Sequence, residues 1–358
     1  MLTIPQLLRF AVQQKASDVH LSAGEPPMLR IHGDMVRLDV PALTAEDTHR
    51  LIFDVMSDGQ RRGFQDKLES DFAFALDDDL RFRVNAFVQN RGEGAVFRTI
   101  PTKIPRFDDL GLPEVLRQLC DEEKGLVLVT GPTGSGKSTT LAAMIDYINE
   151  SVPGHILTLE DPIEFVHKPK RCLVNQREVG TQTQSFNNAL RGALREDPDV
   201  ILVGELRDLE TIQLALTAAE TGHLVFGTVH TSSAAKTVDR LVDVFPPAQQ
   251  AQVRTMLSES LLGVCTQMLM SKVGGGRAAA LELLIGTPAV RNLIREGKTH
   301  QIPSAMQVGA KAGMVTMEAA VMDLVNRGVV TADEARKRVP ELAHLFDKHQ
   351  PVARGVAR

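Results

Sequence analysis

The sequence predicts an α/β protein in which a small α+β domain precedes a larger domain with a parallel sheet, and a mostly helical region ends the chain. A chain of 358 residues is longer than a typical single domain, so two domains are expected. Residues 80–87 alternate apolar and polar side chains, and a turn-like stretch leads from them into a second strand, which is typical of a β-hairpin. After residue 111, short apolar runs alternate with helical stretches, as buried parallel strands alternate with helices.

The first 100 residues account for the α+β domain. Residues 2–16 have the apolar spacing of a helix, and a short strand is expected at 19–21. A strand at 80–87 is followed by the turn-like QNRGEG and by a second strand at 95–100, which completes the hairpin. The apolar face of the first strand consists of Leu80, Phe82, Val84 and Ala86, and its polar face of Arg81, Arg83 and Asn85.

The segment 101–113 contains three prolines and is the expected interdomain linker. From 114 to 280 the chain contains the apolar runs GLVLVTG, HILTLED, DVILVGE and HLVFGTVH, each bounded by Gly, Asp, Glu or His. Such runs predict the buried strands of an α/β core. The region 281–358 is expected to be mostly helical.

Composition argues against several classes of protein. The formal net charge is −5 with both signs mixed along the chain, aromatic residues make up 4% and there is no Trp, so neither a charged nucleic-acid tail nor stacking platforms for single-stranded nucleic acid are expected. The three cysteines are far apart and fit neither a disulfide framework nor a metal pair. The start of the chain lacks the apolar core of a signal peptide, and no apolar run reaches about 18 residues. We therefore expect a cytoplasmic protein that does not insert into a membrane.

The stretch from Gly131 to Ser138 reads GPTGSGKS and matches the phosphate-binding pattern G-x-x-x-x-G-K-[ST]. An apolar strand enters this P-loop and a helix-like stretch leaves it, so that backbone N–H groups and a helix N-terminus converge on phosphates. Lys137 is expected to reach the β- and γ-phosphates of ATP, and Ser138 to ligate Mg²⁺. The expected nucleotide-binding residues are Gly131, Pro132, Thr133, Gly134, Ser135, Gly136, Lys137, Ser138 and Thr139.

Hydrolysis also needs a carboxylate near the attacking water, and two strand ends offer one. The first is LTLEDPIE, which ends at Glu164, and the second is VILVGE, which ends at Glu205 in the Walker B position. The carboxyl ends of parallel strands form the ligand crevice of an open α/β sheet. We assign Glu164 to water activation and Glu205 to the Mg²⁺ shell, although the roles could be exchanged, and either acid alone could be a solvated loop residue.

His223 and His230 lie on either side of the apolar run LVFGTV. An extended strand between them separates the two side chains by roughly 23 Å, which is too far for one metal ion. His230 is expected at the carboxyl end of the strand beside the γ-phosphate, where we count it among the catalytic candidates. His223 is expected at the other end, facing something else, and a structural role for either histidine remains open.

Several long motifs in this order resemble the secretion ATPases of the type II secretion and type IV pilus class. They are ASDVHLS at 16–22, RFRVNAFVQNRGEGAVFRTIP at 81–101, GPTGSGKSTT, LTLEDPIEFVH, LREDPDVILVGELRDLETI and AETGHLVFGTVHTSSAAKTVDR. The resemblance covers nearly the whole chain. It implies a homohexamer of RecA-like domains, each preceded by a PAS-like domain, with ATP between one subunit's C-terminal domain and an N-terminal domain.

The resemblance also implies that arginines of the hairpin act as charge-neutralising fingers on the nucleotide. A guanidinium fork suits the dispersed charge of phosphoryl transfer. We assign this role to Arg83 and Arg98, whereas Arg81 is as well explained as a solvated neighbour.

Within that class the motifs are most similar to the ATPases that retract pili in twitching motility. Assembly and type II secretion ATPases usually carry a tetracysteine zinc module and a longer N-terminal extension, for which this chain has neither the cysteines nor the length. The implied function is ATP-driven pilus retraction at the inner face of the inner membrane, with a platform protein as partner. The alternatives are an accessory retraction paralogue, an assembly or type II secretion ATPase, a RecA-like nucleic-acid translocase and a non-catalytic nucleotide-binding scaffold.

The stretch AVRNLIREGK at 289–298 predicts a short helix outside the nucleotide motifs. Thr287 suits the N-cap, Pro288 the first turn and Gly297 the C′ position. The apolar stripe is formed by Val290, Leu293 and Ile294, and Arg291 and Arg295 share a polar face with Asn292 and Glu296. A solvated face is the simpler reading. The resemblance ties this motif to retraction, and it favours a surface that touches the next subunit or the platform protein.

Overall fold

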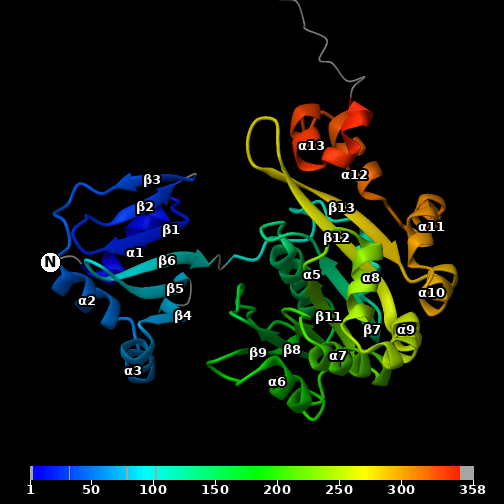
Figure 1. The fold of residues 1–358 in the computed structure, drawn as a ribbon, viewed down its shortest axis with the longest axis horizontal. Coiled ribbons are helices and arrows are strands. Elements are labelled where there is room, and N and C mark those ends of the chain that lie inside the picture. The colour runs from blue at the N-terminus through cyan, green and yellow to red at the C-terminus, as the bar shows by residue number, and fades with distance from the viewer. Residues whose placement is uncertain (1–2, 32, 78–79, 101–102, 347–358) are drawn as a thin grey trace, which may run out of the picture. The chain divides into compact units, whose positions relative to one another are not determined.

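The computed structural model describes residues 3–31, 33–77, 80–100 and 103–346, and it divides into two compact units (Figure 1). One unit comprises Met1–Ile104 with Glu164–Val166, and the other comprises Pro105–Ile163 with His167–Arg358. The division falls inside the segment 101–113 that we expected to be a linker, of which residues 101–102 lie outside the described residues. Each unit has its own sheet and its own core.

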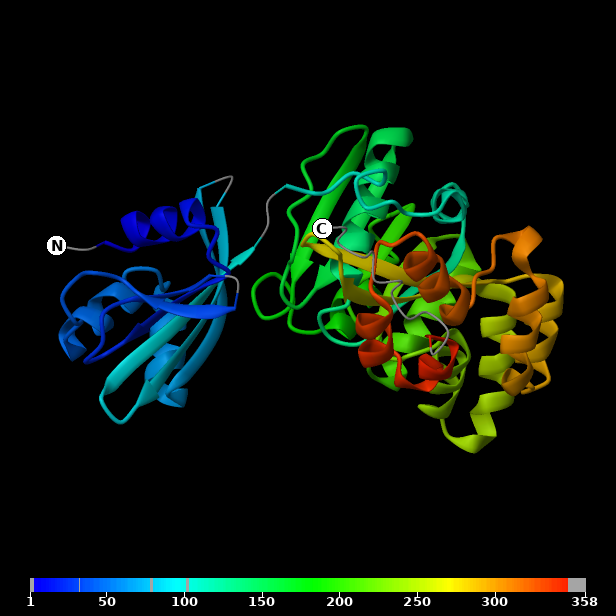
Figure 2. The ribbon, with the colours of Figure 1, turned by 90° about the horizontal axis from the view of Figure 1, so that it is seen from above.

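The first unit is built on a six-stranded sheet in the order β3-β2-β1-β6-β5-β4, in which every neighbouring pair is antiparallel. The predicted hairpin is confirmed as β5 and β6. Figure 2 shows helix α1 beside these strands. The elements are α1 (Ile4–Gln13), β1 (Asp18–Ser22), β2 (Met28–Ile31), β3 (Asp34–Arg37), α2 (Ala45–Phe53), α3 (Asp58–Lys67), β4 (Glu69–Asp77), β5 (Leu80–Gln89) and β6 (Gly92–Ile100).

Strand register places one buried row of side chains across five strands of this sheet. The row consists of Phe72, Val84, Phe97, Val19 and Leu29, which are paired in that order from β4 to β2. Buried residues of α1, α2 and α3 join the same core. Because successive residues of a strand point to opposite faces, the adjacent row projects from the other face of the sheet.

The second unit contains a seven-stranded sheet in the order β13-β12-β7-β11-β10-β8-β9. Only β13 runs antiparallel to its neighbour, and the other neighbouring strands are parallel. The elements up to the end of the sheet are α4 (Glu114–Cys120), β7 (Gly125–Thr130), α5 (Lys137–Ser151), β8 (Gly154–Glu160), β9 (Cys172–Glu178), α6 (Phe186–Ala193), β10 (Val200–Val203), α7 (Leu209–Thr221), β11 (Leu224–Val229), α8 (Ala234–Asp243), α9 (Pro247–Ser260), β12 (Leu261–Ser271) and β13 (Arg277–Ile285).

Both faces of this sheet are buried, which explains the continuous apolar runs of its strands. On β7, Leu126 and Leu128 belong to one core cluster together with residues of α6 to α9, and Val127 and Val129 belong to a second cluster together with residues of α4 and α5. All six residues of β7 and all six of β11 are buried. The sheet is therefore covered by helices on both sides, as predicted for an α/β domain.

The helical region begins later than expected. We placed its start at residue 281, but strand β13 occupies Arg277–Ile285 and pairs with β12 along its whole length. The sequence AALELLI carries no alternation because this stretch is largely buried, and its helix-forming residues concealed the strand. The helices that follow are α10 (Pro288–Arg295), α11 (Ile302–Val308), α12 (Met317–Asn326) and α13 (Ala332–Arg338), and residues 347–358 lie outside the described part.

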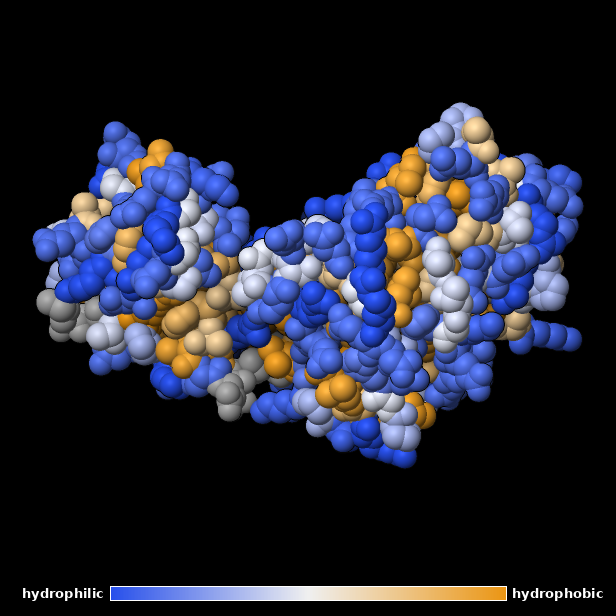
Figure 3. All heavy atoms as spheres, turned by 90° about the horizontal axis from the view of Figure 1, so that it is seen from below, coloured by the Kyte–Doolittle hydropathy of each residue, from blue (hydrophilic) through white to orange (hydrophobic). Residues whose placement is uncertain are grey.

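Within the described ranges, no helix combines the length and the apolar character needed to cross a bilayer. The face drawn in Figure 3 carries hydrophilic and hydrophobic residues side by side.

Candidate nucleotide-binding site

The P-loop joins the end of β7 to the start of α5. Gly131, Gly134 and Gly136 have φ values of +135°, +78° and +90°, a region that side chains with a Cβ rarely adopt. Gly136 is the N-cap of α5 and provides no side-chain cap for the first turn. The N–H groups of that turn are therefore not satisfied by a side-chain cap, which suits them to an anion at the positive end of the helix.

Lys137 folds back over the loop. Its ammonium donates hydrogen bonds to the carbonyl oxygens of Gly131 at 3.0 Å and Pro132 at 3.1 Å, and the residue is only 9% exposed. Ser135 is also buried, and its hydroxyl has no hydrogen-bond partner among the described residues. A buried cation, an unpartnered hydroxyl and three glycines that admit close approach fit a phosphate group bound in this loop.

Glu205 follows β10, and its backbone position is fixed by both neighbouring strands. The Gly204 N–H donates to the Leu159 carbonyl of β8 at 2.7 Å, and the Thr228 hydroxyl of β11 donates to the Gly204 carbonyl. A Cβ at position 204 would lie 3.1 Å from the Leu159 oxygen, so a residue larger than glycine would crowd this crossing. Glu205 is thus held at the carboxyl edge of the parallel sheet, as predicted.

The Glu205 carboxylate lies among three cationic or titratable groups. Arg207 approaches the carboxylate to 2.6 Å, and His230 Nε2 lies 3.5 Å from the same oxygen. Burial opposes ionisation of Glu205, but the hydrogen bond and charge of Arg207, followed by the charges of His230 and Lys137, lower its pKa below the ordinary value. The structure therefore brings Glu205, His230 and the P-loop lysine together and adds Arg207, which the sequence analysis did not select.

The two histidines have different surroundings, as their spacing predicted. His230 follows β11 at its carboxyl end and is exposed beside Glu205. His223 precedes the same strand, and its Nδ1 lies 3.0 Å from the Ala218 carbonyl at the end of α7. His223 therefore contacts a helix end, at the opposite end of the strand from His230.

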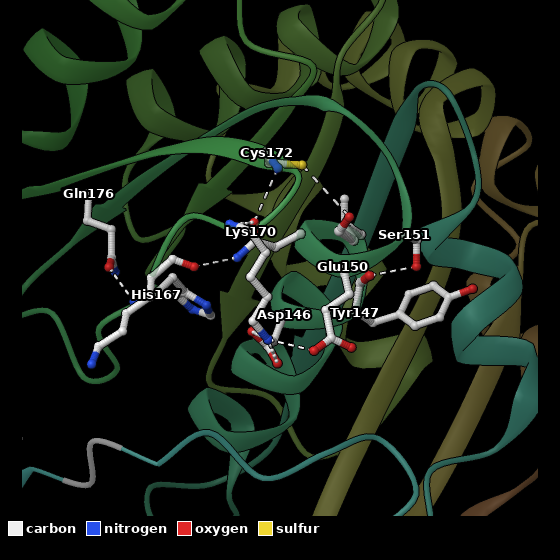
Figure 4. Close-up of polar contacts among 11 residues, drawn as sticks. Asp146, Tyr147, Glu150, Ser151, His167, Lys170, Cys172 and Gln176 are labelled. Carbon is white, nitrogen blue, oxygen red and sulfur yellow. Dashed lines mark hydrogen bonds and ion pairs between the residues drawn. The ribbon is translucent and has the colours of Figure 1, made fainter.

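Glu164 lies in the segment between β8 and β9, four residues beyond the end of β8, and is exposed. The start of the segment is fixed by the Ile163 N–H, which donates to the Glu178 carboxylate at 3.0 Å. The end of the segment is attached to α5, where Lys170 contacts the carboxylates of Asp146 and Glu150 at 2.8 and 2.7 Å (Figure 4). The segment that carries the acid is thus anchored at both ends within the described structure.

The predicted arginines lie in the first unit, on the open face of its sheet. Strand register places Arg83 directly opposite Arg98, and Arg98 opposite Asp18. The Arg98 Nε donates to the Asp18 carboxylate at 2.8 Å, while 67% of the Arg98 side chain remains exposed. Asp18 offsets one of the two positive charges in this row, and both arginine side chains remain exposed, so the row could also pair with a negatively charged ligand. Arg81, the alternative, is half-buried on the same strand.

Helix α10 forms as predicted. The Thr287 hydroxyl accepts from the Val290 N–H, Pro288 occupies the first turn and Gly297 has a φ of +68° after the helix end. Val290 and Ile294 are buried, and Leu293 is half-buried.

The polar face of α10 differs from the expectation in one respect. Arg291 turns back, and its Nε donates to the Gly286 carbonyl at 2.7 Å, whereas Arg295 is exposed. The two arginines therefore do not offer equivalent side chains to a partner, because a hydrogen bond to the preceding loop holds the first of them.

The described residues contain no group of three or more His, Cys, Asp or Glu side chains that could hold a metal ion by themselves. Mg²⁺ bound with a nucleotide needs few protein ligands, because phosphate oxygens and water complete its shell. The half-buried Ser138 and the Glu205 carboxylate fit this requirement.

Comparison with known proteins agrees with this geometry. The family model described as "Type II/IV secretion system protein" matches residues 2–344. The type IV pilus retraction ATPase PilT of Pseudomonas aeruginosa is 60% identical over 340 residues, which cover 94% of this chain and 99% of PilT. The chain belongs to the type II/IV secretion system protein family. The relatives in this family are ATPases, and so is this chain.

Two further relatives place the chain within this family. The type IV pilus ATPase PilU of Pseudomonas aeruginosa is 40% identical, and the match covers 92% of this chain and 87% of PilU. The crystal structure of the pilus retraction motor PilT with bound ADP matches with a TM-score of 0.90 and 51% identity, covering 95% of this chain and 98% of that one. The predicted fold class, a P-loop ATPase domain preceded by a small α+β domain, is thus confirmed.

Proposed function

We propose that this chain is the motor ATPase that retracts type IV pili in twitching motility, working as a homohexamer with ATP and Mg²⁺. The observation that carries the proposal is the complete P-loop together with Glu205, Arg207 and His230, in a chain 60% identical to the retraction ATPase PilT. The lower identity to PilU, 40%, favours the main motor over the accessory paralogue. The inner-membrane platform protein of the pilus is the expected partner, and the cytoplasmic face of that membrane is the expected location.

The P-loop residues and the two acids would divide the chemistry among them. Lys137 and the N–H groups at the start of α5 bind and neutralise the phosphates. Ser138 and Glu205 would hold Mg²⁺, which would supply positive charge to neutralise the phosphate oxygens. Glu164 orients and deprotonates that water, and its role and that of Glu205 could be exchanged.

His230 lies 3.5 Å from the carboxylate of Glu205, close enough to respond to what binds there. It would hold the carboxylate oriented, and it would contact the γ-phosphate from the end of β11. The hydroxyl of Thr228, two residues before His230, donates to the Gly204 carbonyl, so the strand end that carries His230 is linked to the one that carries Glu205.

Two arginines of the first unit, Arg83 and Arg98, form an arginine row that would complete the site of a neighbouring subunit. Arg83 and Arg98 lie side by side on an exposed face and would stabilise the charge that spreads over the transferred phosphoryl group. A site shared between subunits couples hydrolysis to movement of one subunit against the next. Ring assembly is therefore part of the proposal.

Three measurements on the full chain test the proposal together. Light scattering after size exclusion, with and without ATP, reports the oligomer, and release of phosphate reports turnover. Retraction of labelled pili is then observed in a host lacking its own retraction ATPases, with and without this chain. The proposal requires a hexamer, Mg²⁺-dependent turnover and restored retraction. Salt-sensitive DNA binding with DNA-stimulated turnover would instead support the nucleic-acid translocase.

A further inference from the structure

Strand β12 runs beside β7 and continues past the root of the P-loop. Thr266 of β12 pairs with Thr130, the last residue of β7, and Gln267 is the next residue of β12. The side chains of Thr130 and Thr266 are hydrogen-bonded at 2.9 Å, and Thr266 in turn hydrogen-bonds to the buried carboxylate of Glu282 on β13. Gln267 is therefore held beside the loop by strands β7, β12 and β13, whose buried side chains are hydrogen-bonded to one another.

The Gln267 side chain is 3% exposed, and both ends of its amide contact the phosphate-binding segment. Its Nε2 donates to the carbonyl oxygen of Ser135 at 2.7 Å, and its Oε1 accepts from the hydroxyl of Thr140 at 2.9 Å. One side chain thus links β12 to the loop and to the first turn of α5. The two contacts require a donor at one end and an acceptor at the other, which a neutral amide provides.

The glycines of the loop show how closely β12 approaches. A Cβ at Gly131 would lie 2.3 Å from the backbone oxygen of Gln267, and a Cβ at Gly136 would lie 2.8 Å from its Nε2. Both distances are shorter than real contacts allow. The backbone of Gln267 therefore leaves no room for a Cβ at Gly131, and a Cβ at Gly136 would displace the Gln267 amide; the φ values of +135° and +90° favour glycine at both positions as well.

The hydrogen bond to Ser135 has a consequence for the groups that bind phosphate. The Ser135–Gly136 peptide is trans, so its carbonyl and its N–H point in opposite directions. A carbonyl held toward Gln267 therefore turns the Gly136 N–H away from β12. The oriented N–H is a preorganised donor for an anion, and preorganisation avoids the cost of reorienting the loop when the ligand binds.

We propose that Gln267 is a positioning residue of the nucleotide site, which holds the Ser135–Gly136 peptide so that its N–H faces the bound phosphate. The inference rests on the proposed binding of nucleotide at this loop. Gln267 itself does not touch the nucleotide. Its amide acts through the loop, and its effect is therefore on nucleotide affinity and on turnover rather than on folding alone.

Two variants of the full chain separate this role from simple packing. Gln267→Met keeps the length of the side chain and removes both hydrogen bonds. Gln267→Glu keeps the shape, but as a carboxylate it cannot donate to the Ser135 carbonyl. When protonated it again offers a donor and an acceptor, and burial raises the pKa of such a carboxyl. Gln249→Glu, at an exposed position of α9, is the matched control for charge.

The measurement is the affinity for a fluorescent ADP, compared with that of the unchanged protein at about pH 7.5 and about pH 5.5. Gln267→Met should bind roughly 10-fold more weakly at both values, and Gln267→Glu should bind more weakly at the higher pH and recover at the lower. Equal affinity of Gln267→Met and the unchanged protein, or a Gln267→Glu defect that low pH does not reverse, overturns the inference. Failure of the unchanged protein to bind the probe would instead contradict the proposed function.

Discussion

The guanidinium of Arg207 lies 2.6 Å from the carboxylate of Glu205, the side chain that we assign to the Mg²⁺ shell. A cation that binds this carboxylate must compete with the arginine. The Arg207 side chain is 70% exposed and Glu205 is 20% exposed, so the pair can separate into water with little loss. Arg207 is thus a reversible partner of Glu205.

Replacing Arg207 should therefore change the requirement for Mg²⁺. We expect Arg207→Gln to reach half-maximal ATPase activity at a several-fold lower Mg²⁺ concentration, because the carboxylate loses the guanidinium that competes with the metal. A Mg²⁺ titration of initial rates checks this, with Arg195→Gln, an exposed arginine, as control. An unchanged or higher Mg²⁺ requirement would show that Glu205 does not bind the metal in competition with Arg207.

The two acids should be distinguishable by their variants. Glu164→Gln and Glu205→Gln should each lower kcat by about 100-fold or more, as expected when a base or a metal-shell acid is lost. Nucleotide affinity should fall less in Glu164→Gln than in Glu205→Gln, since Glu164 is assigned to the attacking water and Glu205 to the metal. Rate and ADP-binding measurements on both variants test the assignment, and loss of activity in the Glu205 variant alone would reverse the roles.

The exposed arginine row should act on the nucleotide of a neighbouring subunit. Arg83→Ala and Lys137→Ala should each abolish most turnover, but a mixture of the two should regain part of it, because some interfaces combine an intact P-loop with an intact arginine. Mixed hexamers are verified by two affinity tags. If verified mixtures show no recovery, Arg83 does not complete a neighbour's site.

His167 should make the protein sensitive to mild acid. Burial lowers its pKa from 6.5 to about 4, so the folded state holds it neutral while the unfolded chain takes up a proton. The stabilising contribution of neutral His167 is complete above about pH 6.5 and is lost as the pH falls toward 4, by up to about 3 kcal/mol. The melting temperature, measured at several pH values, should therefore depend less steeply on pH in His167→Phe than in the unchanged protein. Parallel curves for the two proteins would contradict this.

Variants in helix α10 should separate ATP hydrolysis from force transmission. Arg295→Ala should preserve hexamers and most ATPase activity while abolishing pilus retraction, because the residue is exposed and distant in sequence from the nucleotide motifs. Arg291→Ala should in addition lower the melting temperature, since it removes the hydrogen bond to the Gly286 carbonyl. The double variant should combine both effects. Normal retraction by Arg295→Ala would leave that face of the helix without a role in coupling.

Much of the site was predictable because its signals are local. The P-loop, the acid just after β10 and the histidine just after β11 each follow a short apolar run, and parallel strands bring such ends to one edge. The hairpin of β5 and β6 was predictable from period-two alternation, and α10 from its caps. In each case the deciding residues lie within about ten positions of one another.

The remaining features depend on contacts that local patterns do not contain. Gln267 contacts a carbonyl 132 residues earlier in the chain, and no periodicity marks it. Strand β13 is largely buried and rich in helix-forming residues, so it resembled a helix. Strand β4, whose apolar and polar residues do not alternate cleanly, was also missed. For Arg207 a signal existed, since it is two residues beyond the predicted acid.

The central claim is that ATP hydrolysis at this P-loop drives pilus retraction, and the most direct test relates the two rates. Retraction speed of labelled pili is measured in a host without its own retraction ATPases, with the unchanged chain, Glu164→Gln, Glu205→Gln and Lys137→Ala expressed at equal levels. The account predicts that speed falls with the kcat measured for each purified protein and reaches zero with Lys137→Ala. Retraction at unchanged speed by a variant without turnover would contradict it.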